Sequence, residues 1–317
     1  MSALAELRTQ ASSHPKLTRE ERRRLNARQQ WDKSGYLFLL PWMIGIAGLT
    51  VIPMVASLYF SFTKYPLLKG PTWIGVDNYV QLFNDHRAWV SLGVTALYVV
   101  IGVPLQLMVA LAIAVLLDRG MKGLSFYRSV LYLPSLLGGS VAIAILWKTV
   151  FGADGIVNAF LGIFGIQGMG WVSNPKTALG TVILLHCWTF GSAMVIFLAG
   201  LRNIPAMYYE AAEIDGASSW KRFTSITVPL LTPIIFFNLV MQIIAAFQSF
   251  TQAYIISGGD GQPADSLLFY ALYLYKNAFS YFKMGYAAAM AWVLFIIIAI
   301  VTGINFLLSK YWVFYDA

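Results

Sequence analysis

Residues 202–228 hold side chains of the kinds that bind another protein. Hydrogen-bond acceptors, donors and apolar anchors follow one another there, namely Glu210, Glu213, Asp215, Lys221, Arg222, Trp220 and Phe223. Between them Ala211, Ala212 and Ala217 leave little side-chain bulk, so another surface could approach closely. The residue types alone leave two readings open, a docking surface for a partner or an amphipathic connector that rests on lipid.

These residues (the 202–228 segment) also carry the signals of two short helices. Pro205 suits the first turn of a helix, and Gly216 can end that helix by adopting a positive φ. Ser218 is a suitable cap for a second helix, and Pro229 suits the start of the apolar stretch that follows. The spacing therefore predicts a helix-turn-helix.

Other kinds of chemistry find little support in the residues. No P-loop string G-x-x-x-x-G-K-[ST] occurs, and this string supplies the backbone amides and the lysine that surround phosphate. The single cysteine, Cys187, leaves no disulfide or thiolate metal site within the chain, and His14, His86 and His186 do not cluster in the sequence. We therefore predict a non-catalytic chain with no metal site and no cofactor of its own.

Polar residues inside the long apolar stretches form a second group of interest. The stretch 229–256 holds Asn238, Gln242, Gln248, Ser249, Thr251 and Gln252. Polar groups that face lipid are costly, so these should face protein or water. Hydrogen bonds between helices and a cavity explain them equally well. The apolar stretches lack the acidic and basic residues that ion-driven carriers usually place there, so an ion-coupled secondary carrier is the weaker alternative for the chain.

The elements that position these residues are predicted to be membrane-spanning helices. The chain has 317 residues, of which 58% are hydrophobic and 11% charged, whereas soluble domains average about 25% charged. Uncharged gaps long enough for the roughly 20 apolar residues that cross a bilayer recur along it. Backbone groups in lipid must be satisfied within a helix. Six spans are predicted, at about 36–62, 90–117, 129–149, 177–201, 229–256 and 285–309.

The distribution of Lys and Arg predicts the orientation of these spans. Glycines and polar residues set the uncharged stretch 155–175 apart, so we interpret it as an interfacial helix or a short loop helix outside the membrane. Lys and Arg are frequent in the tail 1–34 and the loops 118–128 and 202–222, which the positive-inside rule places in the cytoplasm together with the C-terminus. The arginines of the tail could indicate nucleic-acid binding, but a topology anchor near anionic lipid is favoured, with no nucleic acid. The transmembrane domain is then 35–317.

A family resemblance adds to this reading. The string EAAEIDGASSWKRFTSITVPLLTP, residues 210–233, resembles the EAA motif of bacterial ABC importer permeases, with matches at Glu210, Ala211, Ala212, Asp215, Gly216, Ala217, Phe223, Ile226, Pro229 and Pro233. Residues 73–79 resemble the outer-loop signature of the carbohydrate-uptake subgroup, and 131–135, 146–152 and 256–259 are also similar to it. The resemblance covers about 35–315 and is closest to the first permease of importers of the maltose and glycerol-phosphate types.

The resemblance implies a fold, partners and a location. The fold is an all-α membrane protein with six spans, the type I ABC importer permease fold, with a cytoplasmic helix-turn-helix coupling loop. The partners are a second permease subunit in a heterodimer, two cytoplasmic ATPase subunits that hold ATP and Mg, an extracellular solute-binding protein, a carbohydrate substrate and membrane lipid. The location is a bacterial cell membrane, with both termini in the cytoplasm.

The resemblance also implies two sets of site residues. The ATPase-coupling set is Glu210, Ala211, Ala212, Asp215, Gly216, Ala217, Trp220, Arg222 and Phe223. The substrate-binding set, placed by its position relative to the EAA motif, is Trp188, Thr189, Ser192, Gln242, Ala246 and Ser249. Sugars are bound by hydrogen bonds and aromatic stacking, and these side chains offer both.

Overall fold

The computed structural model describes residues 36–66, 70–118 and 123–314, and it divides the chain into two units, 1–57 and 58–317. The predicted basic tail 1–34 lies outside the described residues. The first unit contains most of the helix Tyr36–Ser61, in which the π-helical turn η1 (Ala47–Val51) precedes α3 (Ile52–Ser61). This helix is long and apolar enough to cross a membrane, as predicted for 36–62.

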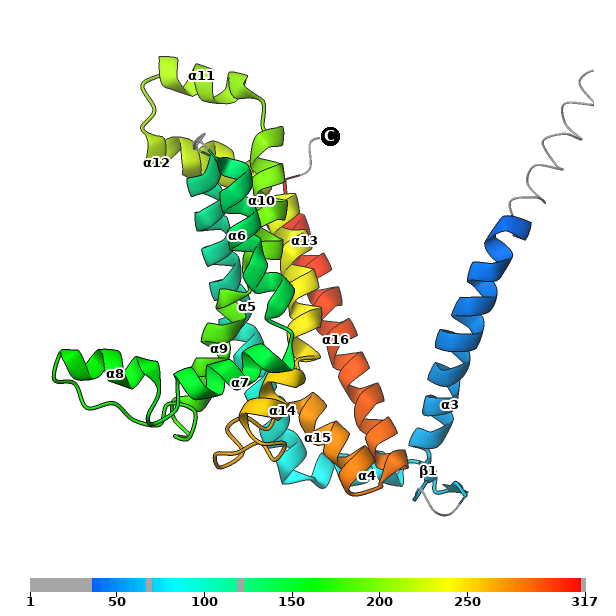
Figure 1. Cartoon of the computed structure of the whole chain (residues 1–317). Coiled ribbons are helices and arrows are strands. Elements are labelled where there is room, and N and C mark those ends of the chain that lie inside the picture. Colours follow the sequence, from blue (N-terminus) through cyan, green and yellow to red (C-terminus); the bar gives the residue numbers. More distant parts are fainter. Residues whose placement is uncertain (1–35, 67–69, 119–122, 315–317) are drawn as a thin grey trace, which may run out of the picture. The chain divides into compact units, whose positions relative to one another are not determined.

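Helix α5 (His86–Asp118) is the centre of the second unit (Figure 1). It packs against α9 (Ala178–Trp188), α10 (Gly191–Asn203) and α13 (Val228–Phe247). Fully buried Ala110 and Ala114 lie on its packed side, and small residues of this kind let helix backbones approach closely. Helix α16 (Met284–Trp312) packs along α13.

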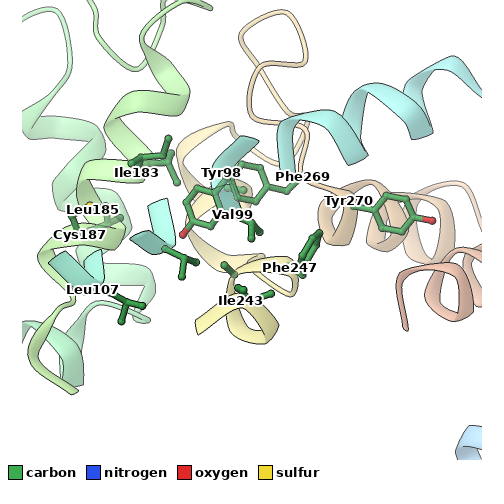
Figure 2. Packing of buried hydrophobic residues seen from close by; sticks show 14 of the residues in the cluster. Tyr98, Val99, Leu107, Ile183, Leu185, Cys187, Ile243, Phe247, Phe269 and Tyr270 are labelled. Atoms are coloured by element: carbon green, nitrogen blue, oxygen red, sulfur yellow. The ribbon is translucent and has the colours of Figure 1, made fainter. Parts of the chain in front are cut away.

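The apolar core of this unit is built from helices that are distant in sequence. Figure 2 shows Tyr98, Val99 and Leu107 of α5 in one cluster with side chains of α9 and α13, and with the pair Phe269 and Tyr270. The rings of Tyr98 and Phe269 lie 4.8 Å apart between centroids. This packing holds α5 and α9 in a fixed arrangement, and both helices carry polar residues that are described below.

The stretch predicted as a single span over 129–149 is two helices. Helix α6 (Leu124–Leu137) and helix α7 (Val141–Val150) meet at 95°. Glycines 138 and 139 interrupt the helix after Pro134, and the Ser140 side chain caps α7 by accepting a hydrogen bond from the Ile143 amide at 3.3 Å. A hydropathy window does not register these local signals, which is why the bend was missed.

Two further stretches are interrupted in the same way. The predicted span 177–201 consists of α9 and α10, bent by 43° at Thr189 and Phe190. The predicted span 229–256 continues a longer helical stretch, Ser219–Ile256, in which residues 248–250 separate α13 from α14 (Thr251–Ile256). Six spans are therefore reached in the described chain only when each bent pair counts as one span.

Short elements flank the long helices. Strands β1 (Thr63–Lys64) and β2 (Thr72–Trp73) pair antiparallel, with Thr63 opposite Trp73, and α4 (Asp77–Asn84) follows them. Helix α8 (Ile156–Ile163) is the loop helix predicted within 155–175. Helix α15 (Tyr270–Tyr275) and the π-helical turn η3 (Lys276–Ser280) occupy a loop for which we predicted no helix.

The 202–228 segment forms the predicted helix-turn-helix. It contains α11 (Ala206–Ile214), α12 (Ser219–Arg222) and the π-helical turn η2 (Phe223–Thr227), which leads without a break into α13. Pro205 precedes α11 as its N-cap and does not lie inside the first turn. Within the second unit, Figure 1 shows α11 and α12 at one end of α5 and α10, and α4 and α15 at the other end.

Candidate functional site

The three helix interruptions of the second unit lie around one cavity of about 400 Å³ (the central cavity). Residues from the α6–α7, α9–α10 and α13–α14 junctions contribute, together with α5. The lining residues are Tyr98, Gln106, Ser135, Gly138, Gly139, His186, Thr189, Ser192, Gln242, Ala245, Ala246, Gln248, Ser249, Phe250, Thr251 and Gln252. Ten of these lining residues carry a hydroxyl or amide side chain, so the wall is suited to hydrogen bonding with a polar, uncharged surface.

The interruption at Thr189 leaves a backbone carbonyl that side chains satisfy. The Gln106 Nε2 donates to the Thr189 carbonyl at 3.1 Å, and the Ser135 hydroxyl donates to the same oxygen at 2.9 Å. The Thr189 hydroxyl in turn donates to the His186 carbonyl at 2.7 Å. Buried backbone acceptors need such partners, so α5 and α6 hold the α9–α10 junction in place.

A second contact ties the α6–α7 and α13–α14 junctions together. The Gln252 Nε2 donates to the Gly138 carbonyl at 3.0 Å. Gly138 also has no room for a side chain, because a Cβ there would overlap the Thr189 methyl group. The α6–α7 and α9–α10 junctions can therefore approach this closely because residue 138 is glycine.

Five of the six residues in the predicted substrate-binding set line the central cavity: Thr189, Ser192, Gln242, Ala246 and Ser249. The sixth, Trp188, is not among the lining residues of the described chain, and its ring lies 6.1 Å from that of Trp147. The role of these six residues in substrate binding stays a prediction. Of the six polar residues singled out in 229–256, Asn238 bonds to the Ile234 carbonyl of its own helix at 3.0 Å, whereas the other five line the cavity.

Sequence reasoning missed the contribution of α5 and α6 to this wall. Gln106 was the available signal, because it is the one amide side chain within the apolar stretch 90–117. Its partner Thr189 is 83 residues away in the chain, so no spacing rule connects the two. Tyr98 and Ser135 were missed for the same reason.

The turn of the 202–228 segment has the backbone geometry predicted for it. Gly216 has a φ of +74°, and the amides of Gly216 and Ala217 donate to the carbonyls of Glu213 and Ala212 at 3.0 and 2.9 Å. These bonds satisfy the last carbonyls of α11. The Ser218 hydroxyl accepts from the Lys221 amide at 3.3 Å and caps α12.

Two side-chain contacts hold α11 against α12 and η2 within the helix-turn-helix of the 202–228 segment (the hairpin). The hydroxyl groups of Tyr209 and Thr227 lie 2.9 Å apart, and Arg222 pairs with Glu213 at 3.0 Å. Beneath them lies an open cavity of about 740 Å³ lined by Trp220, Arg222, Phe223, Tyr209 and residues of α5 and α10.

Most of the predicted coupling residues are open to a partner. The Trp220 side chain is 73% exposed, and Glu210, Ala211, Asp215 and Gly216 are exposed as well. Ala212, Ala217, Arg222 and Phe223 are half-buried. Sequence reasoning missed Ile214, which is 87% exposed and extends the apolar surface at the end of α11. The structure thus brings the predicted set together on one hairpin, and its role in coupling stays a prediction.

A polar cluster at the opposite end of the second unit was not predicted. The Asp85 carboxylate accepts from the hydroxyls of Tyr273 and Tyr286 at 2.6 and 2.7 Å and from the Arg87 amide at 2.9 Å. Burial raises the pKa of Asp85, but the hydrogen bonds outweigh it and hold that pKa below its usual value. The Arg87 guanidinium donates two hydrogen bonds to the Asp265 carboxylate, at 2.6 and 3.0 Å. The cluster joins the start of α5 to α15, α16 and the 257–269 loop.

Comparison with known families decides what kind of protein carries this architecture. The family described as "binding-protein-dependent transport system inner membrane component" matches residues 97–311, which include the central cavity and the 202–228 segment. The chain belongs to this family. The predicted membership of the ABC importer permeases and the predicted fold are confirmed.

Curated relatives cover nearly the whole transporter subunit. The chain is 56% identical to the probable ABC transporter permease protein YesP of Bacillus subtilis (strain 168), over 90% of this chain and 93% of that protein. It is 33% identical to the lactose transport system permease protein LacF of Rhizobium radiobacter, over 90% and 97%. The similarity therefore extends over most of this inner membrane component and nearly the whole of both permeases.

A solved structure shows the same fold. The inner membrane component superposes with a TM-score of 0.76 on a chain of a bacterial alginate ABC transporter, which was crystallised in complex with an alginate pentasaccharide-bound periplasmic protein. The match covers 90% of this chain and 97% of that chain at 21% identity. At this identity the likeness shows the fold alone.

Proposed function

We propose that this permease subunit carries a carbohydrate across the membrane through the central cavity. The observation that carries the proposal is the wall of hydroxyl and amide groups formed where three helices are interrupted. Groups of this kind exchange hydrogen bonds with sugar hydroxyls without the cost of burying a charge. Relatives support it, since their names specify lactose and arabinooligosaccharides.

The 202–228 segment is the proposed docking site for a cytoplasmic ATPase, which binds ATP and Mg on its own chain. Only residues 204 and 205 separate α10 from α11, and α12 runs through η2 directly into α13. Helices α10 and α13 carry the cavity residues Ser192 and Gln242. A displacement of the hairpin therefore moves two walls of the cavity at once, which is what coupling requires.

The remaining partners follow from what this chain leaves open. The proposed second permease subunit completes the central cavity from the other side, as part of a heterodimer with two ATPase subunits. An extracellular binding protein delivers the carbohydrate at the end that holds α4 and α15. The chain lies in a bacterial cell membrane with both termini in the cytoplasm, and it performs no catalysis itself.

The ion-coupled carrier has no specific support. Among the described residues that line the central cavity there is no Asp, Glu, Lys or Arg, and such residues usually form ion and proton pathways in spans.

Reconstitution tests the proposal. The chain is placed in proteoliposomes with its second permease and its ATPase, and the binding protein is added outside. Uptake of radiolabelled lactose, maltotriose, arabinotriose and alginate trisaccharide is then measured with ATP inside. We expect uptake of at least one of them, and we expect it to stop when the ATPase carries an inactivating substitution. Uptake by this chain alone, driven by an ion gradient, would contradict the proposal, as would failure to transport any carbohydrate.

A further inference from the structure

Gln106 is a deeply buried amide on the wall of the central cavity. The residue is 2% exposed, and its Nε2 donates to the Thr189 carbonyl and hydroxyl at 3.1 and 3.2 Å. Its Oε1 is buried and has no hydrogen-bond partner among the described residues. Buried polar atoms without a partner are rare in native proteins, and each one calls for a specific explanation.

The Thr189 contacts fix which end of the Gln106 amide faces which neighbour. The Thr189 carbonyl oxygen can only accept, and the Thr189 hydroxyl gives its own proton to the His186 carbonyl at 2.7 Å. Both groups therefore require the NH₂ end of the amide, so a flipped orientation would place two acceptors against each other. The Oε1 atom is consequently left as a buried acceptor without a partner, in a residue that lines the central cavity.

The surrounding helices keep this acceptor in place. Val103 and Ala110, on either side of Gln106 along α5, are fully buried. One turn earlier, α5 meets α9 so closely that a Cβ on Gly102 would lie 3.3 Å from the His186 ring. A rigid support of this kind lets a polar group bind a ligand without losing side-chain entropy at the moment of binding.

A second atom of the same wall is also left without a partner. The Nε2 of His186 is buried, and no described residue bonds to it. His186 lines the central cavity together with Gln106, and its backbone carbonyl belongs to the Thr189 network. Two buried polar atoms without partners thus belong to cavity-lining residues of different helices, and a hydrogen-bonding ligand in the cavity would supply the bonds that they lack.

We propose that Gln106 is a specificity-determining residue of the substrate path, whose Oε1 accepts a hydrogen bond from a hydroxyl group of the transported carbohydrate. The inference rests on the proposed function and deepens it. At this point of the wall the ligand must be a donor, so a hydroxyl is accepted, whereas a carboxylate or phosphate oxygen would meet another acceptor. Gln106 lies outside the set that the family resemblance implied, which was confined to α9, α10 and α13 and their junctions.

The test compares deoxygenated sugars in two transporters. The sugar best transported by the reconstituted complex is offered intact and in each of its monodeoxy forms, to the wild type and to Gln106→Met, which keeps the length of the side chain without its amide. Rates are expressed per loaded binding protein and compared as a ratio between the two transporters. The preference of the binding protein itself cancels from that ratio.

We expect one monodeoxy form to be transported roughly 3- to 10-fold more slowly by the wild type, as the net worth of one neutral hydrogen bond implies. In Gln106→Met that penalty should disappear, while the intact sugar is slowed by a similar factor. A purely structural role for Gln106 would slow every sugar equally, so an unchanged pattern of deoxy penalties in the variant would overturn the inference.

A second variant guards against a failure of assembly. Gln106→Asn keeps an amide but withdraws it by one methylene, and the same loss of the single deoxy penalty is expected. The two proposals fail differently. If the wild type transports no carbohydrate the proposed function is refuted, whereas normal uptake with unchanged deoxy penalties in both variants refutes the role of Gln106 alone.

Discussion

Replacement of Gly216 separates backbone strain from contact with a partner. Its φ of +74° favours glycine, and a Cβ at this position would meet no atom within 4 Å. Alanine therefore adds no clash within the chain, but it must adopt a left-handed conformation that costs about 1–2 kcal/mol. At about 1.4 kcal/mol for each factor of ten, this reduces the equilibrium constant for forming the native turn roughly 5- to 30-fold. Asparagine tolerates this conformation far better.

The assay reads the turn and the coupling separately. Hydrogen exchange of the α11 amides reports the turn, and ATP hydrolysis stimulated by loaded binding protein reports the coupling in the reconstituted complex. We expect exchange at the end of α11 to be fastest in Gly216→Val, then Gly216→Ala, and to be nearly unchanged in Gly216→Asn. If the segment docks into a close-fitting groove of the ATPase, all three variants should lose stimulation, Asn included, because each adds bulk at an exposed surface.

Two results would refute this reasoning. Wild-type exchange in Gly216→Ala would show that the turn does not depend on the positive φ. Full stimulation of ATP hydrolysis in Gly216→Val, with normal uptake, would show that the turn is not part of the surface that the ATPase grips.

Three further perturbations follow from the described contacts. Gly191→Ala should destabilise the detergent-solubilised chain by about 1–3 kcal/mol in thermal unfolding, because the new Cβ would lie 2.7 Å from the Leu131 carbonyl, whereas a Cβ on Gly180 meets nothing within 4 Å and Gly180→Ala should not destabilise. Because the folded pKa of Asp85 is depressed, its contribution to stability is full above the unfolded value near 3.8 and is lost as the pH falls through the folded value. The melting temperature, measured from pH 6 to pH 3, should therefore fall more steeply in the wild type than in Asp85→Asn. Equal slopes in the two proteins would contradict this. Ser218→Ala should cost about 1 kcal/mol by removing the α12 cap, measured as faster exchange of the Lys221 amide, and an equal effect of Ser225→Ala would count against the cap.

Local signals in the sequence predicted the hairpin well. Gly216 and Ser218 act on residues at most five positions away, and such short-range bonds depend on little besides residue type. The long apolar stretches were also recognised, since charge and hydropathy alone decide whether a helix can enter lipid. The positions at which the helices break were harder to predict. Glycine is often tolerated inside a helix, and the close approach of Gly138 to Thr189 depends on tertiary packing.

The polar residues show the limit most clearly. Five of the six residues predicted from position in the fourth and fifth spans do line the cavity, but Trp188 packs beside Trp147 instead. Asp85 meets Tyr273 and Tyr286 across 188 and 201 residues of chain, and Gln106 meets Thr189 across 83. Such pairs are determined by helix packing, which a single sequence does not encode in any spacing.

The junctions around the central cavity have a mechanical consequence. A continuous helix resists bending because each turn must break its own hydrogen bonds, but a helix that is already interrupted can pivot there at little cost. Here the pivots are fastened, since Gln252 holds the Gly138 carbonyl and Gln106 and Ser135 hold that of Thr189. These hydrogen bonds therefore hold the junctions in one conformation. The helices on either side can change their angle only after the bonds are exchanged for others. We expect such a cavity to switch between discrete conformations and not to deform gradually. The change of conformation should occur only when displacement of the 202–228 segment is large enough to break these hydrogen bonds.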